Sequence, residues 1–388
     1  MRARSAFTAG ICGAFLFGLA STACAQTTIR IGASVSQTGT YAVPGQNQLR
    51  GYQLCVKQAN ENGGVLERKL ELVTADDQSQ SAVAVKIYEK LITQDKVNAI
   101  LGPYSSPITE FVADVSEKHG MPMLAPGAAL TSIFRKGRKF VFMLYSPAES
   151  YFEGFVEVAA KRGLKTIAIF HQDTAATNAI AQGAADLAKR AGLQNVLMEP
   201  YPRGTHSFRG ILKKVQAANV DVLIVASYLD DSIAFTRQMR ELKINPQMLG
   251  MAIGPALPKF YETLGVSAES IYGSSQWEPE SATLPRLAGE YPGAREFIEA
   301  YRREFPGADL SYHSASGYAA CELLLEAIKR TGSLDRDKLR ETLLALNLNT
   351  PFGAFKVDSG GFQTGHRTQI FQWLHGNKVI VWPEELTR

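Results

Sequence analysis

The segment at residues 97–129 is a β-strand, an α-helix and a second β-strand in immediate succession. The apolar run 97–101 ends at a Gly-Pro pair, and apolar residues then recur with helical spacing from Pro107 to His119. A second apolar run, at 121–125, ends at a Pro-Gly pair. Two strands joined through one helix lie parallel with a right-handed crossover. Both strand ends therefore open on the same edge of the sheet, where open parallel sheets bind ligands.

The same alternation of strands and helices extends over most of the chain and restarts once, near residues 144–148. Such alternation with short loops is typical of a doubly wound, Rossmann-like α/β sheet. The apolar run 220–226 leads to Tyr228, just as the run 97–101 leads to Tyr104. We therefore expect two α/β lobes of the same build, with their ligand-facing edges opposed. A ligand between them would be buried on most sides.

The first 25 residues differ from the rest of the chain. Two arginines precede the apolar stretch 11–20, and an A-x-A site ends at Ala25. This pattern predicts a secretory signal peptide that is cleaved after Ala25, so the mature protein is expected to be exported. A lipoprotein signal is the alternative, with Cys24 as the lipidated residue. No later apolar run approaches the roughly 18 residues of a membrane span, so we expect a soluble mature protein.

Charge and motif content argue against several functions. The chain has 41 basic and 37 acidic residues, and two of the arginines lie in the signal, which leaves 39 against 37. The sequence contains no basic stripe with interleaved aromatic residues, which is the pattern that would predict nucleic-acid binding. The six histidines show no metal-ligand spacing, and no nucleophile elbow, P-loop or dinucleotide fingerprint is present. We expect no metal, no cofactor and no enzymatic activity, with a secreted hydrolase as the alternative.

Two cysteines, Cys55 and Cys321, remain after signal removal, each within a helical pattern. Two cysteines do not make a disulfide framework. We expect two buried thiols, although export to an oxidising compartment leaves pairing open.

At this point the order of motifs resembles a known family. The chain is similar to the periplasmic solute-binding proteins of ABC importers, in the branched-chain amino acid (leucine/isoleucine/valine) class with the type I binding-protein fold. No single motif is diagnostic, but their order and spacing along nearly the whole mature chain are. The motifs are IRIGASVSQTGTYAVPGQNQLRGYQL, ANENGGVLERKLELVTADDQS, AILGPYSS, GMPMLAPGAA, KTIAIFHQD, FRGILKKVQAANVDVLIVAS, YAACELLLEAIKRTG and IFQWLHG.

The resemblance implies two discontinuous lobes joined by three crossovers. Lobe 1 would hold residues 26–146 plus 277–352, and lobe 2 residues 147–276 plus 353–388. The lobes would close over a ligand by hinge motion. An inner-membrane ABC permease would recognise the closed form, and the protein would act in the periplasm as a monomer without performing chemistry. A sensor that reports its ligand to a signalling receptor is the alternative role.

The resemblance also places candidate ligand-binding residues. The ligand's carboxylate would meet Ser106, which we expect to cap its helix, and the backbone at Gly127 and Ala129. Tyr228 would face them from lobe 2. The sequence adds Tyr104 and Trp277 as flat walls, Gln46 and Tyr41 on the first loop, and Thr174 on a loop expected to face the cleft.

The chain departs from the family pattern in ways that bear on the ligand. Alanine stands at 129 in place of the usual threonine, and at 176 in place of a tyrosine, which leaves room for a bulkier ligand. The family carries an acid for the ligand's ammonium on a lobe 2 loop, but the corresponding stretch 250–254 contains none. A buried ammonium without a counter-charge is costly. We therefore expect a carboxylate ligand without an α-amine, with an aromatic or apolar body. Amino acids or amides remain alternatives, with Asp173 or Asp230 replacing the missing acid.

Overall fold

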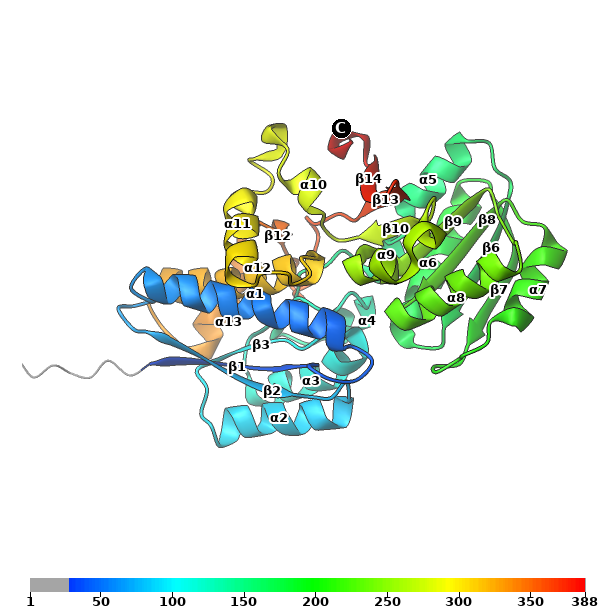
Figure 1. The fold of residues 1–388 in the computed structure, drawn as a ribbon. Helices are drawn as coiled ribbons and strands as arrows, with labels where there is room; N and C mark the ends of the chain where they lie inside the picture. The colour runs from blue at the N-terminus through cyan, green and yellow to red at the C-terminus, as the bar shows by residue number, and fades with distance from the viewer. Residues whose placement is uncertain (1–27, 388) are drawn as a thin grey trace, which may run out of the picture.

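The computed structural model describes residues 28–387, which form two α/β lobes side by side (Figure 1). The predicted signal peptide lies outside these residues. Lobe 1 contains a fully parallel five-stranded sheet in the order β2-β1-β3-β4-β5. Its elements are β1 Ile29–Val35, α1 Ala42–Glu61, β2 Leu70–Asp76, α2 Ser81–Thr93, β3 Ala99–Leu101, α3 Ser106–His119, β4 Met123–Ala125, α4 Thr131–Arg135 and β5 Val141–Met143.

Lobe 2 contains a seven-stranded sheet in the order β14-β13-β10-β9-β8-β6-β7. The strands from β6 to β10 pair in parallel, and the last two strands add an antiparallel edge. Its elements are α5 Glu153–Lys161, β6 Thr166–Gln172, α6 Ala175–Arg190, β7 Gln194–Tyr201, α7 Arg209–Ala218, β8 Val222–Ser227, α8 Leu229–Glu241, β9 Met248–Ile253, α9 Pro258–Leu264, β10 Tyr272–Ser275, β13 Gln369–Leu374 and β14 Asn377–Trp382.

Between β10 and β13 the chain returns to lobe 1, where α12 packs along α1 (Figure 1). The chain therefore passes between the sheets three times. The expected boundary at 352/353 would separate β11 from β12, which pair as an antiparallel hairpin. We accordingly place the third crossover after β12, within 357–368. The elements of this segment are α10 Pro279–Ala282, α11 Ala294–Glu304, α12 Tyr312–Thr331, α13 Arg336–Ala345, β11 Asn347–Thr350 and β12 Gly353–Lys356.

The core follows from the parallel pairing. Strands covered on both faces need apolar residues on both faces, and every residue of β4, β5, β8 and β9 is buried. The strand-helix-strand prediction at 97–129 is confirmed as β3, α3 and β4. Gly120 ends α3 in the left-handed conformation, at φ 56°, as its position predicted. Among the described residues, no helix is long and apolar enough to span a membrane.

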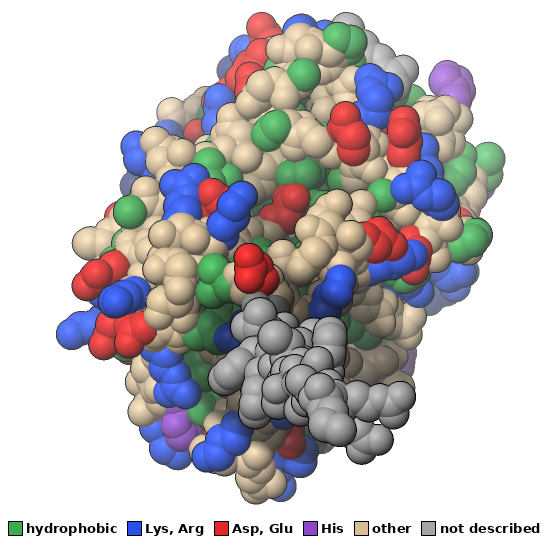
Figure 2. Space-filling model, turned by 90° about the vertical axis from the view of Figure 1, so that its left-hand side faces the viewer, with side chains coloured by type: hydrophobic (Ala, Val, Ile, Leu, Met, Phe, Trp, Pro, Cys, Tyr) green, Lys and Arg blue, Asp and Glu red, His purple; other side chains and the backbone are tan. Residues whose placement is uncertain are grey.

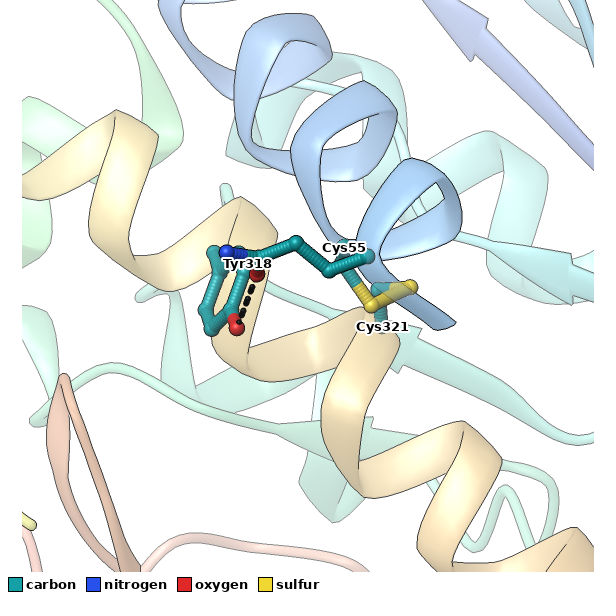
Figure 3. The surroundings of a disulfide bond; sticks show 4 residues. Cys55, Tyr318 and Cys321 are labelled. Carbon is teal, nitrogen blue, oxygen red and sulfur yellow. Dashed lines mark hydrogen bonds between the residues drawn. A yellow bond between two sulfur atoms is a disulfide. The ribbon is translucent and has the colours of Figure 1, made fainter. Parts of the chain in front are cut away.

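The expectation of two free thiols is wrong, because Cys55 and Cys321 form a disulfide (Figure 3). The close packing of α1 against α12 brings the Cα atoms of the two cysteines to 6.2 Å from each other, within the usual range for a disulfide. The bond joins the two separate segments of lobe 1. Beside it, the Tyr318 hydroxyl donates a hydrogen bond to Gln58 Oε1 at 2.7 Å.

Surface charge is mixed. Figure 2 shows acidic and basic side chains interspersed over the face that it draws, rather than gathered by sign. Nucleic-acid binding depends on concentrated positive charge, which this face does not offer.

Candidate functional site

A cavity of about 20 Å³ lies where the two lobes meet, at the carboxyl ends of the parallel strands. This volume holds about one water molecule, so the side chains almost fill the space and the lobes must separate to admit a larger ligand. No charged side chain is among the described residues that line it. The lining consists of Tyr104, Ser105, Ser106, Gly127, Ala129, Tyr145, Ala148, Tyr151, Ala176, Ile180, Tyr228, Ile253 and Tyr312.

Ser106 contributes a hydroxyl group whose oxygen is already hydrogen-bonded but whose O–H is free to donate. Its Oγ accepts hydrogen bonds from the backbone N–H groups of Ala129, at 3.0 Å, and Leu130, at 3.3 Å. A serine oxygen has two acceptor sites, so only the O–H remains to donate. The predicted cap is off by one residue: Ser105 is the N-cap of α3, its side chain makes no capping bond, and its buried Oγ has no partner. Ser106 is thus a donor toward the cavity rather than a helix cap.

Gly127 is required by close packing. Its backbone forms a parallel bridge with Tyr104. A Cβ at Gly127 would lie 2.7 Å from Gln48 Oε1, 2.8 Å from the Pro103 carbonyl oxygen and 2.9 Å from the Tyr104 Cα atom. The glycine therefore lets the two strand ends of lobe 1 meet at the cavity. The neighbouring Ala129 lines the cavity, but its N–H is taken by Ser106.

Tyrosine hydroxyls converge on the cavity from both lobes. Burial raises the pKa of Tyr104, and the nearby hydroxyls of Tyr312, Tyr228 and Tyr151 raise it further. Burial also raises the pKa values of Tyr228 and Tyr312, and neighbouring tyrosines raise both values further. The phenols are therefore neutral at physiological pH and present O–H donors and flat rings.

Four helices present their N-terminal ends to the same cavity. Ser106 begins α3, Ala176 lies in the first turn of α6, Tyr228 is the N-cap of α8, and Tyr312 begins α12. Three of these helices have no acidic residue in the first turn, whereas α8 carries two aspartates there. Helix N-termini carry partial positive charge and unpaired N–H groups, which favour an anion. The uncharged cavity therefore lies in a field that suits a carboxylate.

The predicted site residues separate into two groups. Ser106, Gly127, Ala129, Tyr104 and Tyr228 line the cavity. Tyr41 lies at its mouth, with its ring centroid 5.7 Å from that of Tyr104 and 5.1 Å from that of Tyr228.

The other three predicted residues lie outside the cavity lining. Trp277 is fully buried, donates its indole N–H to the Pro351 carbonyl at 2.9 Å, and serves as packing at a crossover. Gln46 donates to the Gln37 carbonyl at 2.9 Å. Thr174 caps α6 by accepting the Thr177 N–H at 3.2 Å.

Sequence reasoning missed Tyr145, Tyr151 and Tyr312, because the crossovers and α12 bring them to the cavity from distant parts of the chain. A tyrosine at the first position of a helix, as at position 312, was the available signal. The stretch 250–254 is mostly buried strand rather than loop, and of its residues only Ile253 lines the cavity. Among the described residues no group of three or more histidine, cysteine or acidic side chains is placed to hold a metal ion.

Similarity to known proteins covers nearly the whole chain. "Leu/Ile/Val-binding protein homolog 7" of Brucella melitensis is 27% identical over 383 residues, which cover 94% of each chain. A leucine-binding protein from Thermotoga maritima superposes with a TM-score of 0.81 at 23% identity, covering 91% of this chain and 97% of that one. A solute-binding protein of an ABC transporter from R. palustris, in complex with benzoate, superposes with a TM-score of 0.80 at 18% identity, covering 92% and 96%.

The two structural neighbours confirm the predicted type I fold with two lobes. A family model described as "Periplasmic binding protein" matches residues 28–378. The motif order that resembled this family and the fold with two lobes thus agree with the comparisons. The chain belongs to the periplasmic binding protein family of ABC transporters.

Proposed function

We propose that this protein captures a small carboxylate without an α-amine between its lobes and delivers it to an inner-membrane ABC permease. The protein would be exported to the periplasm by its signal peptide and act as a monomer. The observation that carries the proposal is the convergence of helix N-termini on a cavity without charged side chains. That field stabilises an anion and disfavours a cation.

The carboxylate end is best placed in lobe 1. Ser106 accepts two backbone N–H groups, which leaves its own O–H to donate to a carboxylate oxygen. Ser105 Oγ, which is buried without a partner beside it, is a second donor. Hydrogen bonds to a charged group contribute about 1.5–3 kcal/mol each, enough to hold a small acid at this end.

The remainder of the ligand would meet tyrosine rings and apolar side chains. Tyr104, Tyr228 and Tyr312 offer flat faces, while Ile180 and Ile253 offer aliphatic ones. An aromatic or apolar acid fits these walls, since aromatic pairs and apolar burial both contribute to affinity. The structural neighbour in complex with benzoate is consistent with this class.

Branched-chain amino acids are the second candidate. The specific observation in their favour is Asp230, which lines the adjoining space at the cavity mouth together with Tyr41, Tyr228 and Ile253. A carboxylate there could meet an ammonium group once the lobes adjust to a ligand. The curated relative named above is a Leu/Ile/Val-binding protein homolog.

Calorimetric titration separates the two candidates. Benzoate, 4-hydroxybenzoate, leucine, valine and leucinamide would each be titrated into the mature protein. We expect benzoate or its hydroxylated analogue to bind at least tenfold more tightly than leucine. Leucine or valine binding more tightly than every acid without an amine would overturn the proposal.

Ser106→Ala provides a matched test of the carboxylate end. Removing the O–H should weaken benzoate by about tenfold or more, because a hydrogen bond to a charged group is lost. Benzamide, which has the same ring without the charge, should lose much less. Equal losses for benzoate and benzamide would contradict the placement of the carboxylate at Ser106.

A further inference from the structure

The three crossovers between the lobes meet at a closed set of hydrogen bonds, which we call the hinge triangle: Ser146, Gln276 and His366. The Ser146 N–H donates to Gln276 Oε1 at 2.8 Å, and the Ser146 hydroxyl donates to the His366 carbonyl at 3.0 Å. His366 Nε2 lies 2.8 Å from the Gln276 carbonyl, which only accepts, so Nε2 carries the proton. Each crossover contributes one corner, so the triangle fixes the crossovers relative to one another.

The Gln276 side chain lies outside the cavity lining and links the hinge triangle to Tyr151, a residue that lines the cavity. Because the Ser146 N–H is a donor, the atom that accepts it must be Oε1, and Nε2 faces away from the triangle. Nε2 is buried without a hydrogen-bond partner in a residue that is 1% exposed. The amide acts on the hydroxyl of Tyr151, opposing the rise in pKa that burial causes there. Tyr151 lines the cavity.

An unpartnered buried N–H donor is rare and costly in a native protein. A ligand carboxylate that accepts the Tyr151 O–H would make the Tyr151 oxygen available as an acceptor for Gln276 Nε2. When Tyr151 donates its O–H to the ligand, its oxygen is polarised and becomes a better acceptor for Gln276 Nε2. The resulting chain of hydrogen bonds runs from the ligand through Tyr151 and Gln276 to the Ser146 N–H.

We propose that Gln276 is a positioning residue that couples occupancy of the cavity to the arrangement of the hinge. The inference rests on the proposed function, since it takes the cavity as the ligand site and a carboxylate as the ligand. Ligand contact at the Tyr151 hydroxyl and the closed hinge triangle then stabilise each other through one amide group. By linkage, a change at the hinge that displaces Gln276 must also weaken the ligand.

A double-mutant cycle with benzoate as the probe tests the coupling. The parent protein, Tyr151→Phe, Gln276→Leu and the double variant would be titrated by calorimetry. Each single variant should weaken benzoate about 2- to 10-fold, the range of one hydrogen bond. The double variant should bind benzoate about as tightly as the single variant that has the lower benzoate affinity. Multiplicative losses in the double variant would overturn the proposal.

Gln363→Leu is the matched control. Gln363 is also buried, at 2% exposed, and its amide also ties a crossover to lobe 1 by donating to the Leu144 carbonyl at 3.2 Å. This variant should lose stability like Gln276→Leu, yet leave the benzoate loss caused by Tyr151→Phe unchanged. Coupling of equal size in both glutamine variants would indicate general loosening of the hinge and contradict a role specific to Gln276.

Small-angle scattering of the ligand-free protein keeps the inference separate from the ligand assignment. Loss of the Gln276 contact should let the lobes separate and raise the radius of gyration of Gln276→Leu. An unchanged radius of gyration would overturn the hinge role of Gln276, whether or not the parent protein binds benzoate. Failure of the parent protein to bind benzoate would instead count against the proposed function. Gln276→Met, which keeps the side-chain length without either polar atom, serves as the second variant.

Discussion

The disulfide between Cys55 and Cys321 should be a major source of stability for lobe 1. The two cysteines are 266 residues apart in the sequence, and the bond joins α1 to α12, the elements that hold the two segments of lobe 1 together. Cross-linking a loop of that length removes about 19 cal/mol/K of unfolded-chain entropy, or about 5–6 kcal/mol at 25 °C. Halving the effective loop would lower this figure by only about 0.6 kcal/mol, so residual structure in lobe 2 changes little.

Urea denaturation of the oxidised and the dithiothreitol-reduced protein measures this contribution on the same sequence. Because many bridges deliver less than the entropy estimate, we expect a loss of about 2–5 kcal/mol on reduction. Cys55→Ala/Cys321→Ala should behave like the reduced protein and should not respond to dithiothreitol. Ligand affinity should be unchanged at temperatures where the reduced protein remains folded, because neither cysteine lines the cavity between the lobes. Coincident unfolding curves for the two redox states would refute the reasoning.

Three further outcomes are expected. Ile253→Glu should raise leucine affinity relative to benzoate by about tenfold or more in competitive titrations, because it supplies a counter-charge for an ammonium; an unchanged ratio would remove Ile253 as the discriminating position. Gly127→Ala should destabilise the protein by about 1–3 kcal/mol in urea and abolish ligand binding, because its Cβ would meet three atoms within 3 Å; wild-type binding would show that the strand ends tolerate the methyl group. Burial lowers the pKa of His366 to about 4, against an ordinary value of 6.5, so the folded protein binds fewer protons and stability falls as the pH drops from about 6.5 to about 4. His366 should account for about 3 kcal/mol of that loss. In His366→Gln the urea midpoint should fall less steeply over this range, and His313, whose pKa burial lowers to about 3, should account for part of the remaining slope.

The fold was largely predictable because its signals are local. The alternation of apolar runs with amphipathic segments predicted both sheets, and the run at 97–129 predicted β3, α3 and β4. Four strands were missed, β5, β9, β10 and β11. β5 is only three residues long, and the family pattern assigned the stretch 250–254, which is mostly β9, to a loop. The disulfide was not predictable from spacing, because it depends on the packing of two helices that are remote in the sequence.

The candidate site was predictable only where one strand–helix junction supplies it. Ser106 and Gly127 follow neighbouring strands of one βαβ unit, so parallel pairing alone brings them together. Tyr151 and Tyr312 depend instead on how the crossovers and α12 close against the sheets, which no local pattern encodes. Trp277 was a reasonable candidate wall by residue type, but its indole N–H found a partner in the crossover.

The charge balance of the cavity links the fold to the choice of ligand. A doubly wound sheet directs helix N-termini to the edge where its strands end, so the fold itself supplies positive potential at the cavity. An amino acid ligand needs one negative side chain set against that field, whereas an acid without an amine needs none. In this chain the position facing lobe 1 is Ile253, a β-branched residue held at φ 62° and ψ −67°. Such a conformation is strained for isoleucine and persists only where the surroundings impose it. The backbone at the end of β9 thus directs this position into the cavity, and under the proposed function we expect its apolar side chain to disfavour an ammonium group there.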